Sequence, residues 1–593
     1  MKTLKLTYPS QNPGTHLLVN TDLDDLSHWL ESLPSGNMEK YVPKVRDAIA
    51  NLNRTELPIN HRLQLLKVMD VAYEKIHNYY RPLMQSGPFK GKHAPQEQLS
   101  ELNRLTTEMS FGYKMAVSGL ASKRMFFRKN YDLSAAINMA LHYLGLMLLE
   151  SYELYQPIPK HVWSEIYQLY HYAEQKEISE EEVQTEHSQK AIPIIEFTFL
   201  RNCLLSLANP YHLQRGDHWE VFKYLCHWAQ LTVLSDDSDD FKEQHCFVID
   251  LNQDEKPIAL KELPDAIQHP MQRFVLTEEM INNIDYQIEQ INQTRTSLEN
   301  CFSRNVIARK GLHILDDLKA SWEMKQELQS QRYPDINKME VIWGLDNVHK
   351  VLSLLDPLNP YGSELSAEEN QHTTKTLIER NWATVNNSNG GICIGDPDEK
   401  VRDLDVGKIV ALRENVKNKE NPVPQTWQLG IICWITGSAR NGTRVGIQFL
   451  RGEIQPVQLQ ARKGNKLETR YKQALLLSGE VINGLSTPTL LTAPGLYVEA
   501  RPLRMQIGDE VQNIHARTKV NSSITVDRFF YQQDFQSLDE VEVDLKQKAK
   551  DEGVDEIINL SSTPGPYERP IDDETIKKAK PDPTLDDVIL KKN

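Results

Sequence analysis

Asn386-Asn387-Ser388-Asn389-Gly390-Gly391 separates a long helical region from a run of short, β-branched segments. The pair Asn389-Gly390 predicts a tight hairpin, because a type I′ turn needs positive φ at both central residues and these residue types tolerate it. The same stretch reads Asn-x-Ser-x-x-Gly. An amide, a hydroxyl and backbone N–H groups left open by glycine can together form a small anion-binding concavity. The stretch therefore has two interpretations, a structural turn and a ligand-binding turn.

Segments with the composition and alternation of strands follow this hairpin. The first three are Val406–Arg413, Trp427–Trp434 and Arg444–Leu450. Others continue as far as Phe530, separated by Gly, Asn and Pro. We therefore predict an antiparallel β-barrel over residues 381–455. For residues 456–535 we predict either a second small barrel or an enlargement of the first.

Taken in this order, the hairpin and the strands resemble the PilZ family, small bacterial β-barrels of which many bind cyclic di-GMP. The resemblance covers about residues 380–451. It implies that Asn386, Ser388 and Gly391 contact the ligand. In that family an Arg-x-x-x-Arg segment before the first strand clamps the phosphates and guanines, which suits a planar guanidinium. The corresponding region here holds one arginine, Arg380, which we predict as the fourth ligand-binding residue.

Arg-x-x-x-Arg occurs literally at two other places in the chain. Arg124 and Arg128 lie in the helical region, and a helical-region arginine such as Arg128 is an alternative source of positive charge for the ligand. Arg440 and Arg444 lie in a second predicted hairpin, where we interpret them as its solvated tip.

The whole-chain composition predicts a soluble, multidomain, cytoplasmic protein. The chain has 593 residues, 40% apolar and 25% charged, with a formal net charge of −15, so a non-specific nucleic-acid or anionic-membrane interaction is not expected. The six cysteines form no Cys-x-x-Cys pair, which is typical of reduced thiols. The most apolar stretch, Leu133–Leu149, carries a polar stripe of Ser134, Asn138 and His142. We therefore predict a buried helix there and no membrane span.

Residues 1–355 are predicted to be helical, as a bundle or a solenoid-like array, although no repeat of fixed period is present. Apolar residues at helical spacing mark one such helix, namely Leu65, Met69, Ala72, Ile76 and Tyr79. A strand is expected at Cys246–Leu251. Proline, glycine and polar residues predict a linker at residues 356–380. The acidic, aromatic-poor residues 536–593 predict a disordered tail.

No Walker loop, dinucleotide-binding glycine fingerprint, Gly-x-Ser-x-Gly elbow or His-Glu-x-x-His helix is present in the sequence. We therefore expect no enzyme, no metal and no cofactor, with cyclic di-GMP as the candidate ligand. The first hypothesis is a bacterial receptor or adaptor that couples cyclic di-GMP binding to an unidentified protein partner. The alternative is a nucleotide-independent structural or regulatory adaptor, in which the barrel has lost the ligand and the helices bind the partner.

Overall fold

The computed structural model describes residues 4–85, 96–122, 131–183, 194–237, 246–260, 269–294, 302, 306, 308–324, 333–334, 337–355, 367–396, 404–415, 426–438, 442–463, 466–479, 481–482, 485–486, 488–522 and 525–533. Residues Met1–Gln532 form one compact unit. The predicted disordered tail at residues 536–593 lies outside the described residues. Two features of the unit, a helical region and a pair of β-sheets, confirm the predicted fold class.

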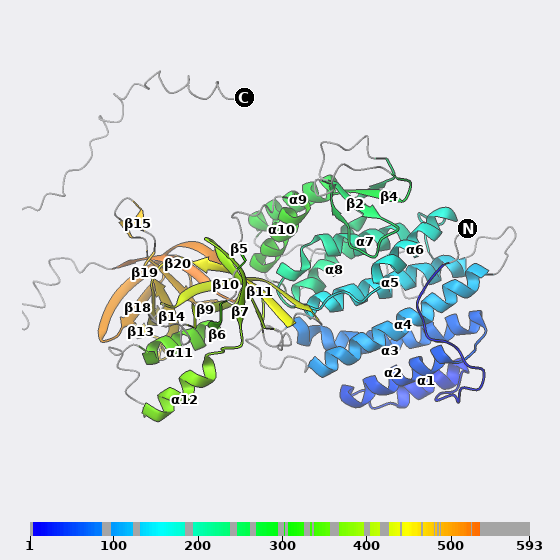
Figure 1. Ribbon diagram of the computed structural model, residues 1–593, viewed down its shortest axis with the longest axis horizontal. Helices are drawn as coiled ribbons and strands as arrows, with labels where there is room; N and C mark the ends of the chain where they lie inside the picture. Colours follow the sequence, from blue (N-terminus) through cyan, green and yellow to red (C-terminus); the bar gives the residue numbers. More distant parts are fainter. Residues whose placement is uncertain are drawn as a thin grey trace, which may run out of the picture. The chain divides into compact units, whose positions relative to one another are not determined.

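The helical region contains ten of the described α-helices (Figure 1). They are α1 (Leu23–Ser32), α2 (Met38–Arg54), α3 (Ile59–Gln85), α4 (Gln96–Ser122), α5 (Tyr131–Glu153), α6 (Val162–Gln175), α7 (Ile195–Leu207), α8 (Asp217–Trp228), α9 (Glu278–Thr294) and α10 (Ala308–Trp322). Short 3₁₀ turns, η1 (Pro210–His212) and η2 (Ala229–Leu231), flank α8. One continuous apolar core joins these helices.

The predicted apolar face of α3 is confirmed except at one position. Leu65, Met69, Ala72 and Ile76 are buried, whereas Tyr79 is 47% exposed and its neighbour Tyr80 is buried instead. The buried face also includes Leu66 and Tyr73. Its centre is therefore rotated away from Tyr79, as expected when every side chain is displaced by about 100° from the previous one.

Helix α5 packs against α4, α6, α7 and α8 (Figure 1). Among the described helices it is the one long and apolar enough to cross a membrane by length and composition, and 78% of its apolar window is buried inside the protein. The polar residues Ser134 and Asn138 are buried with it. Arg201 of α7 approaches His142 of α5, with 3.4 Å between Arg201 Nη1 and His142 Nδ1. These contacts place α5 at the centre of the helical core.

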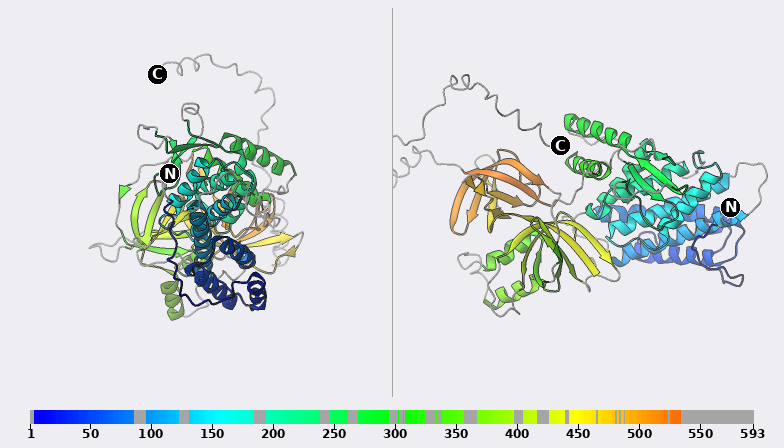
Figure 2. Two further views of the ribbon diagram at one scale, coloured as in Figure 1. Left: turned by 90° about the vertical axis from the view of Figure 1, so that its right-hand side faces the viewer. Right: turned by 45° about the horizontal axis from the view of Figure 1, so that its top comes forward.

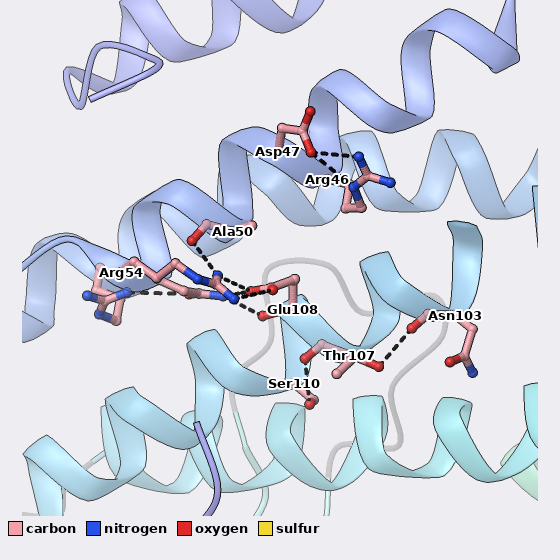
Figure 3. A network of polar contacts seen from close by, with 10 residues as sticks. Arg46, Asp47, Ala50, Arg54, Asn103, Thr107, Glu108 and Ser110 are labelled. Carbon is pink, nitrogen blue, oxygen red and sulfur yellow. Dashed lines mark hydrogen bonds and ion pairs between the residues drawn. The ribbon is translucent and has the colours of Figure 1, made fainter. Parts of the chain in front are cut away.

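Polar contacts also connect α2 to α4 (Figure 3). The guanidinium of Arg54 donates to the Glu108 carboxylate at 3.1 Å and to the Ala50 carbonyl oxygen at 2.6 Å. Because the Arg54 side chain is well exposed, this ion pair contributes little stability. Burial of the apolar faces of the two helices therefore holds α2 on α4.

Two carboxylic acids are buried in the helical core among tyrosines. Asp70 accepts hydrogen bonds from the hydroxyls of Tyr113 and Tyr143. Glu150 accepts one from Thr106 at 2.6 Å. Burial raises the pKa of each acid to about 7, although these hydrogen bonds act in the opposite direction.

The raised pKa of Asp70 predicts that stability decreases as the pH rises. The folded state holds the Asp70 proton between the ordinary pKa of 3.8 and the folded-state pKa of about 7, where the unfolded state has lost it. Unfolding therefore becomes easier with rising pH across that window. We expect the unfolding temperature of the wild type to fall between about pH 5 and pH 8 by more than that of Asp70→Asn. Unfolding temperatures that change equally with pH in the two proteins would contradict a protonated Asp70.

A small antiparallel sheet interrupts the helices, with strand order β1-β4-β2-β3. Its strands are β1 (Val233–Ser235), β2 (Cys246–Asp250), β3 (Ile258–Ala259) and β4 (Gln272–Leu276). The structure confirms the strand predicted at Cys246–Leu251. The other three strands were not predicted, because two or three residues carry no alternation and β4 is buried along its whole length.

The first large sheet has the order β5-β7-β8-β11-β10-β9-β6. Its strands are β5 (Tyr333–Pro334), β6 (Met339–Trp343), β7 (Ala383–Ser388), β8 (Gly391–Asp396), β9 (Ile409–Glu414), β10 (Gln428–Ser438) and β11 (Gly442–Leu450). Two isolated bridges, Lys338 with Ala383 and Val341 with Glu379, bring β6 back to the segment that opens β7. The sheet encloses a core to which Ile392, Ile394 and Ile447 contribute.

The second large sheet closes on itself, because β12 pairs with both β14 and β18 (Figure 2). The order is β13-β12-β14-β17-β20-β19-β18, with β12 (Ile454–Lys463), β13 (Lys466–Leu467), β14 (Lys472–Leu477), β17 (Thr489–Thr492), β18 (Pro502–Ile507), β19 (Glu510–Ser522) and β20 (Asp527–Gln533). A separate hairpin pairs β15 (Val481–Ile482) with β16 (Leu485–Ser486). Of the two arrangements predicted for this region, the structure has the second barrel.

The transition between the helical region and the sheets differs from the sequence prediction. Strands β5 and β6 come from residues assigned to the helical region. Helices α11 (Leu345–Leu355) and α12 (Ala367–Leu377) follow them, and α12 lies within the range predicted as a linker. Its glutamates, glutamine and lysine are good helix formers, which the prediction read only as polar. The structure forms no strand at Leu496–Ala500, where one was predicted.

Candidate functional site

The β7–β8 hairpin carries the Asn-x-Ser-x-x-Gly residues. The strands pair antiparallel, with Ser388 opposite Gly391 and Asn386 opposite Cys393. The Ser388 hydroxyl donates to the Gly391 carbonyl oxygen at 3.1 Å and so fastens the base of the turn. The predicted hairpin is therefore confirmed. Its turn is not type I′, because neither Asn389 nor Gly390 has positive φ.

Gly391 lies against the neighbouring strand β11. A methyl group in place of its hydrogen would overlap the Ile447 carbonyl oxygen, which belongs to the backbone and cannot move aside. Glycine is thus required here by close approach of two backbones.

Asn386, Ser388 and Gly391 share the outer face of the barrel. Successive side chains of a strand point to opposite faces, and Ile392 and Ile394 of β8 point into the core. Gly391 and Cys393 therefore lie on the outer face, and so do their cross-strand partners Ser388 and Asn386. The structure brings these three predicted site residues together.

Arg380, the fourth predicted residue, lies elsewhere. Its Nε donates to Glu340 Oε1 at 2.8 Å, and Arg413 Nε donates to Glu340 Oε2 at 2.8 Å. Burial would raise the pKa of Glu340, but the two arginines outweigh burial and hold that pKa below its usual value. The Arg413 guanidinium also lies 4.4 Å from the centroid of the Trp427 ring.

The separation of Arg380 from the hairpin follows from the backbone. Arg380 precedes Asn386 by six residues, and the segment between them is paired with residues near Met339 and Val341. An extended segment of that length spans about 20 Å. Arg380 therefore contributes a cation to the Glu340 cluster and not to the outer face of the hairpin.

The structure describes one of the four arginines in the two Arg-x-x-x-Arg segments. Arg124, Arg128 and Arg440 lie outside the described residues. Arg444 is in β11, opposite Gly395 of β8 and Thr436 of β10. It is two residues beyond the start of the strand, so it belongs to the body of the sheet, where the sequence predicted a hairpin tip.

A buried polar cluster joins the helical region to the first sheet. The Tyr155 hydroxyl donates to Asp405 Oδ1 at 2.8 Å, and the Arg215 backbone N–H donates to the same oxygen at 3.0 Å. Burial raises the pKa of Asp405. The Gly437 N–H donates to the Tyr155 carbonyl oxygen at 2.6 Å, at the end of β10. The sequence did not predict this cluster, because 250 positions separate Tyr155 from Asp405 and no local pattern indicates that the two residues are in contact.

No group of three or more His, Cys, Asp or Glu residues within the described ranges is placed to hold a metal ion. The polar residues gathered on the outer face of the hairpin are an amide and a hydroxyl. Such groups suit an organic ligand with hydrogen-bond donors and acceptors.

The hairpin, its motif and the surrounding antiparallel barrel resemble a PilZ domain. Residues 357–456 match the family model described as the middle PilZ domain of the cyclic-di-GMP receptor FimW, and residues 24–239 match the model described as its N-terminal domain. The resemblance to the PilZ family is therefore confirmed over this segment.

Over 575 residues the chain is 22% identical to the cyclic-di-GMP receptor FimW of Pseudomonas aeruginosa. The alignment covers 87% of this chain and 90% of that relative, so the similarity extends beyond the PilZ segment to both the helices and the second sheet. No solved structure matches the chain.

Proposed function

We propose that this protein is a cytoplasmic, non-enzymatic receptor for cyclic di-GMP that passes the binding event to a protein partner. The observation that carries the proposal is the gathering of Asn386, Ser388 and Gly391 on the outer face of one hairpin. This hairpin lies in the segment that matches the middle PilZ domain of a cyclic-di-GMP receptor.

The three residues offer complementary chemistry to a cyclic dinucleotide. The Asn386 amide supplies both donors and an acceptor, and the Ser388 hydroxyl has lone pairs left after it donates to Gly391. Gly391 has no side chain to hold a ligand away from the backbone. Phosphates and guanine edges require this mixture of donors and acceptors.

Transmission would use the polar cluster between the helices and the first sheet. Tyr155 bonds to Asp405 through its hydroxyl and to Gly437 of β10 through its carbonyl oxygen. Strand β10 pairs with β11, which pairs with β8 of the binding hairpin. A ligand that binds one arrangement of these strands more tightly than another shifts the population toward the first.

The alternative function is a nucleotide-independent adaptor. The observation in its favour is that Arg380, the one arginine before β7 in the predicted site, is engaged by Glu340. In such a protein the barrel would be structural, and the helical region would bind the partner.

A thermal-shift titration separates the two functions. Binding to the folded state alone stabilises it by about 2.7 kcal/mol when the free ligand is at about 100 times its dissociation constant. We expect cyclic di-GMP to raise the unfolding temperature of the full chain, and GMP to raise it less. Ser388→Ala should reduce the shift. An unchanged unfolding temperature at high micromolar cyclic di-GMP would favour the nucleotide-independent adaptor.

A further inference from the structure

The floor of the outer face next to the binding hairpin consists of three glycines and Cys393, which lies between two of them on the same strand. In two neighbouring strands, Gly391 and Gly395 of β8 and Gly446 of β11 occupy outward positions, because Ile392, Ile394, Val445 and Ile447 between them point into the core. Outward side chains of the adjoining strands, Asn386 and Ser388 on one side and Trp434 and Thr436 on the other, border this floor.

Trp434 lies flat on this floor. A methyl group at Gly446 would meet Nε1, Cε2 and Cδ1 of the Trp434 indole at comparable short distances, as it would over the face of a ring and not at its edge. One face of the indole is therefore pressed on the Gly446 backbone. The side chain is half-buried, so part of the indole is exposed to solvent. A purine base stacks on a surface of this kind.

Arg444 borders the same floor. Its Cγ would lie 3.7 Å from a methyl group at Gly395, so the stem of the side chain extends over β8 toward β7. Arg444 is half-buried, and within the part of the chain that the structure describes no carboxylate forms an ion pair with it. Arg380, by contrast, is paired with the Glu340 carboxylate. Arg444 is therefore a cation available to an anionic ligand.

The register places these groups at a spacing suited to a nucleotide. Residues that face one another across the paired strands form rows perpendicular to the strands. One row contains Ser388 and Gln448, the next contains Asn386 and Trp434, and the third contains Arg444. Neighbouring rows are two residues apart along the strands, or about 7 Å. Arg444 thus lies one row from the indole and two rows from Ser388. A base on the indole would have its phosphate within reach of the guanidinium.

We propose that Arg444 and Trp434 complete the nucleotide site, with Arg444 as the phosphate-binding cation and Trp434 as the stacking surface for a guanine. The proposal rests on the proposed function. It replaces Arg380 by Arg444 as the source of positive charge. A protein with a net charge of −15 repels a dianionic ligand at long range, so a local cation is what the site requires.

Calorimetric titration of the full chain with cyclic di-GMP tests this assignment. Arg444→Ala should weaken binding about tenfold or more, because it removes a charge-assisted contact. Arg504→Ala is the matched control, since Arg504 is a half-buried arginine on a strand of the second sheet and pairs with no carboxylate within the described residues. It should leave the affinity unchanged. The dependence of affinity on salt should also become weaker in Arg444→Ala, which a purely structural role would not cause.

Trp434→Leu tests the stacking surface, because leucine retains an apolar cover for Gly446 and removes the aromatic face. We expect weaker binding with an unfolding temperature close to that of the wild type in the absence of ligand. Wild-type affinity in Arg444→Ala, with a loss in Ser388→Ala or in Arg380→Ala, would overturn the inference and leave the receptor function in place. Absence of binding by the wild type would instead reject the receptor function, and this inference with it.

Discussion

Lys114→Met is expected to destabilise the protein by about 3 to 5 kcal/mol, because it leaves a buried carboxylate without its cation. Lys114 Nζ lies 2.7 Å from Glu165 Oε2, and each side chain is only 2% exposed. Burial lowers the pKa of Lys114, and the Glu165 charge partly restores it. The backbone N–H and the hydroxyl of Thr7 also donate to Glu165, so the pair fixes the N-terminal segment on α4 and α6.

Denaturant unfolding of three proteins measures this effect. Lys114→Met should lower the midpoint strongly, whereas the double variant Lys114→Met/Glu165→Gln should recover most of the loss. The neutral amide removes the uncompensated charge and still accepts from Thr7. Equal losses in the single and double variants would show that packing, and not the buried charge, determines the effect.

Gly391→Val is expected to destabilise the first barrel by about 3 kcal/mol, at the upper end of the cost of overpacking. The branched side chain would meet the Ile447 carbonyl oxygen of β11, which the strand pairing holds in place. Displacement of β8 from β11 would also separate Ser388 from Gly391, its partner across the hairpin, so ligand binding should be lost as well.

Gly36→Val is the matched control for this prediction. Gly36 is exposed, and a methyl group there would meet nothing within 4 Å. Urea unfolding should therefore show a small change for Gly36→Val and a large one for Gly391→Val. Similar stabilities for the two variants would mean that β8 and β11 do not approach each other closely at this glycine.

Local patterns in the sequence were sufficient to predict the hairpin and the main strands of both sheets. The alternation around Asn389-Gly390 and in Arg444–Leu450 reflects one face in the core and one in water, so it is visible without the partner strands. The short strands β5 and β6 have no such signal, because β5 has two residues and β6 is buried along almost its whole length. Nor does any local pattern show that the second sheet closes through β12 and β18.

The candidate site was predictable only in part, because its motif is local and its cation is not. Asn386, Ser388 and Gly391 lie within one hairpin. The choice of Arg380 followed from its place before the first strand, and sequence alone could not show that Glu340 engages it. The alternation of Arg444 with the core residues of β11 does indicate an outward side chain, which is the signal that could have singled it out.

Calorimetric titration of the full chain with cyclic di-GMP tests the central claim most directly, with the double variant Asn386→Ala/Ser388→Ala beside the wild type. Each lost hydrogen bond to a charged group costs about 1.5 to 3 kcal/mol, so the double variant should bind on the order of a hundredfold more weakly or not at all. Arg504→Ala should bind as the wild type does. Heat of binding in the wild type that the double variant loses is the predicted result. Equal affinities in the two proteins, or no heat in either at high micromolar ligand, would contradict a nucleotide site on the β7–β8 hairpin.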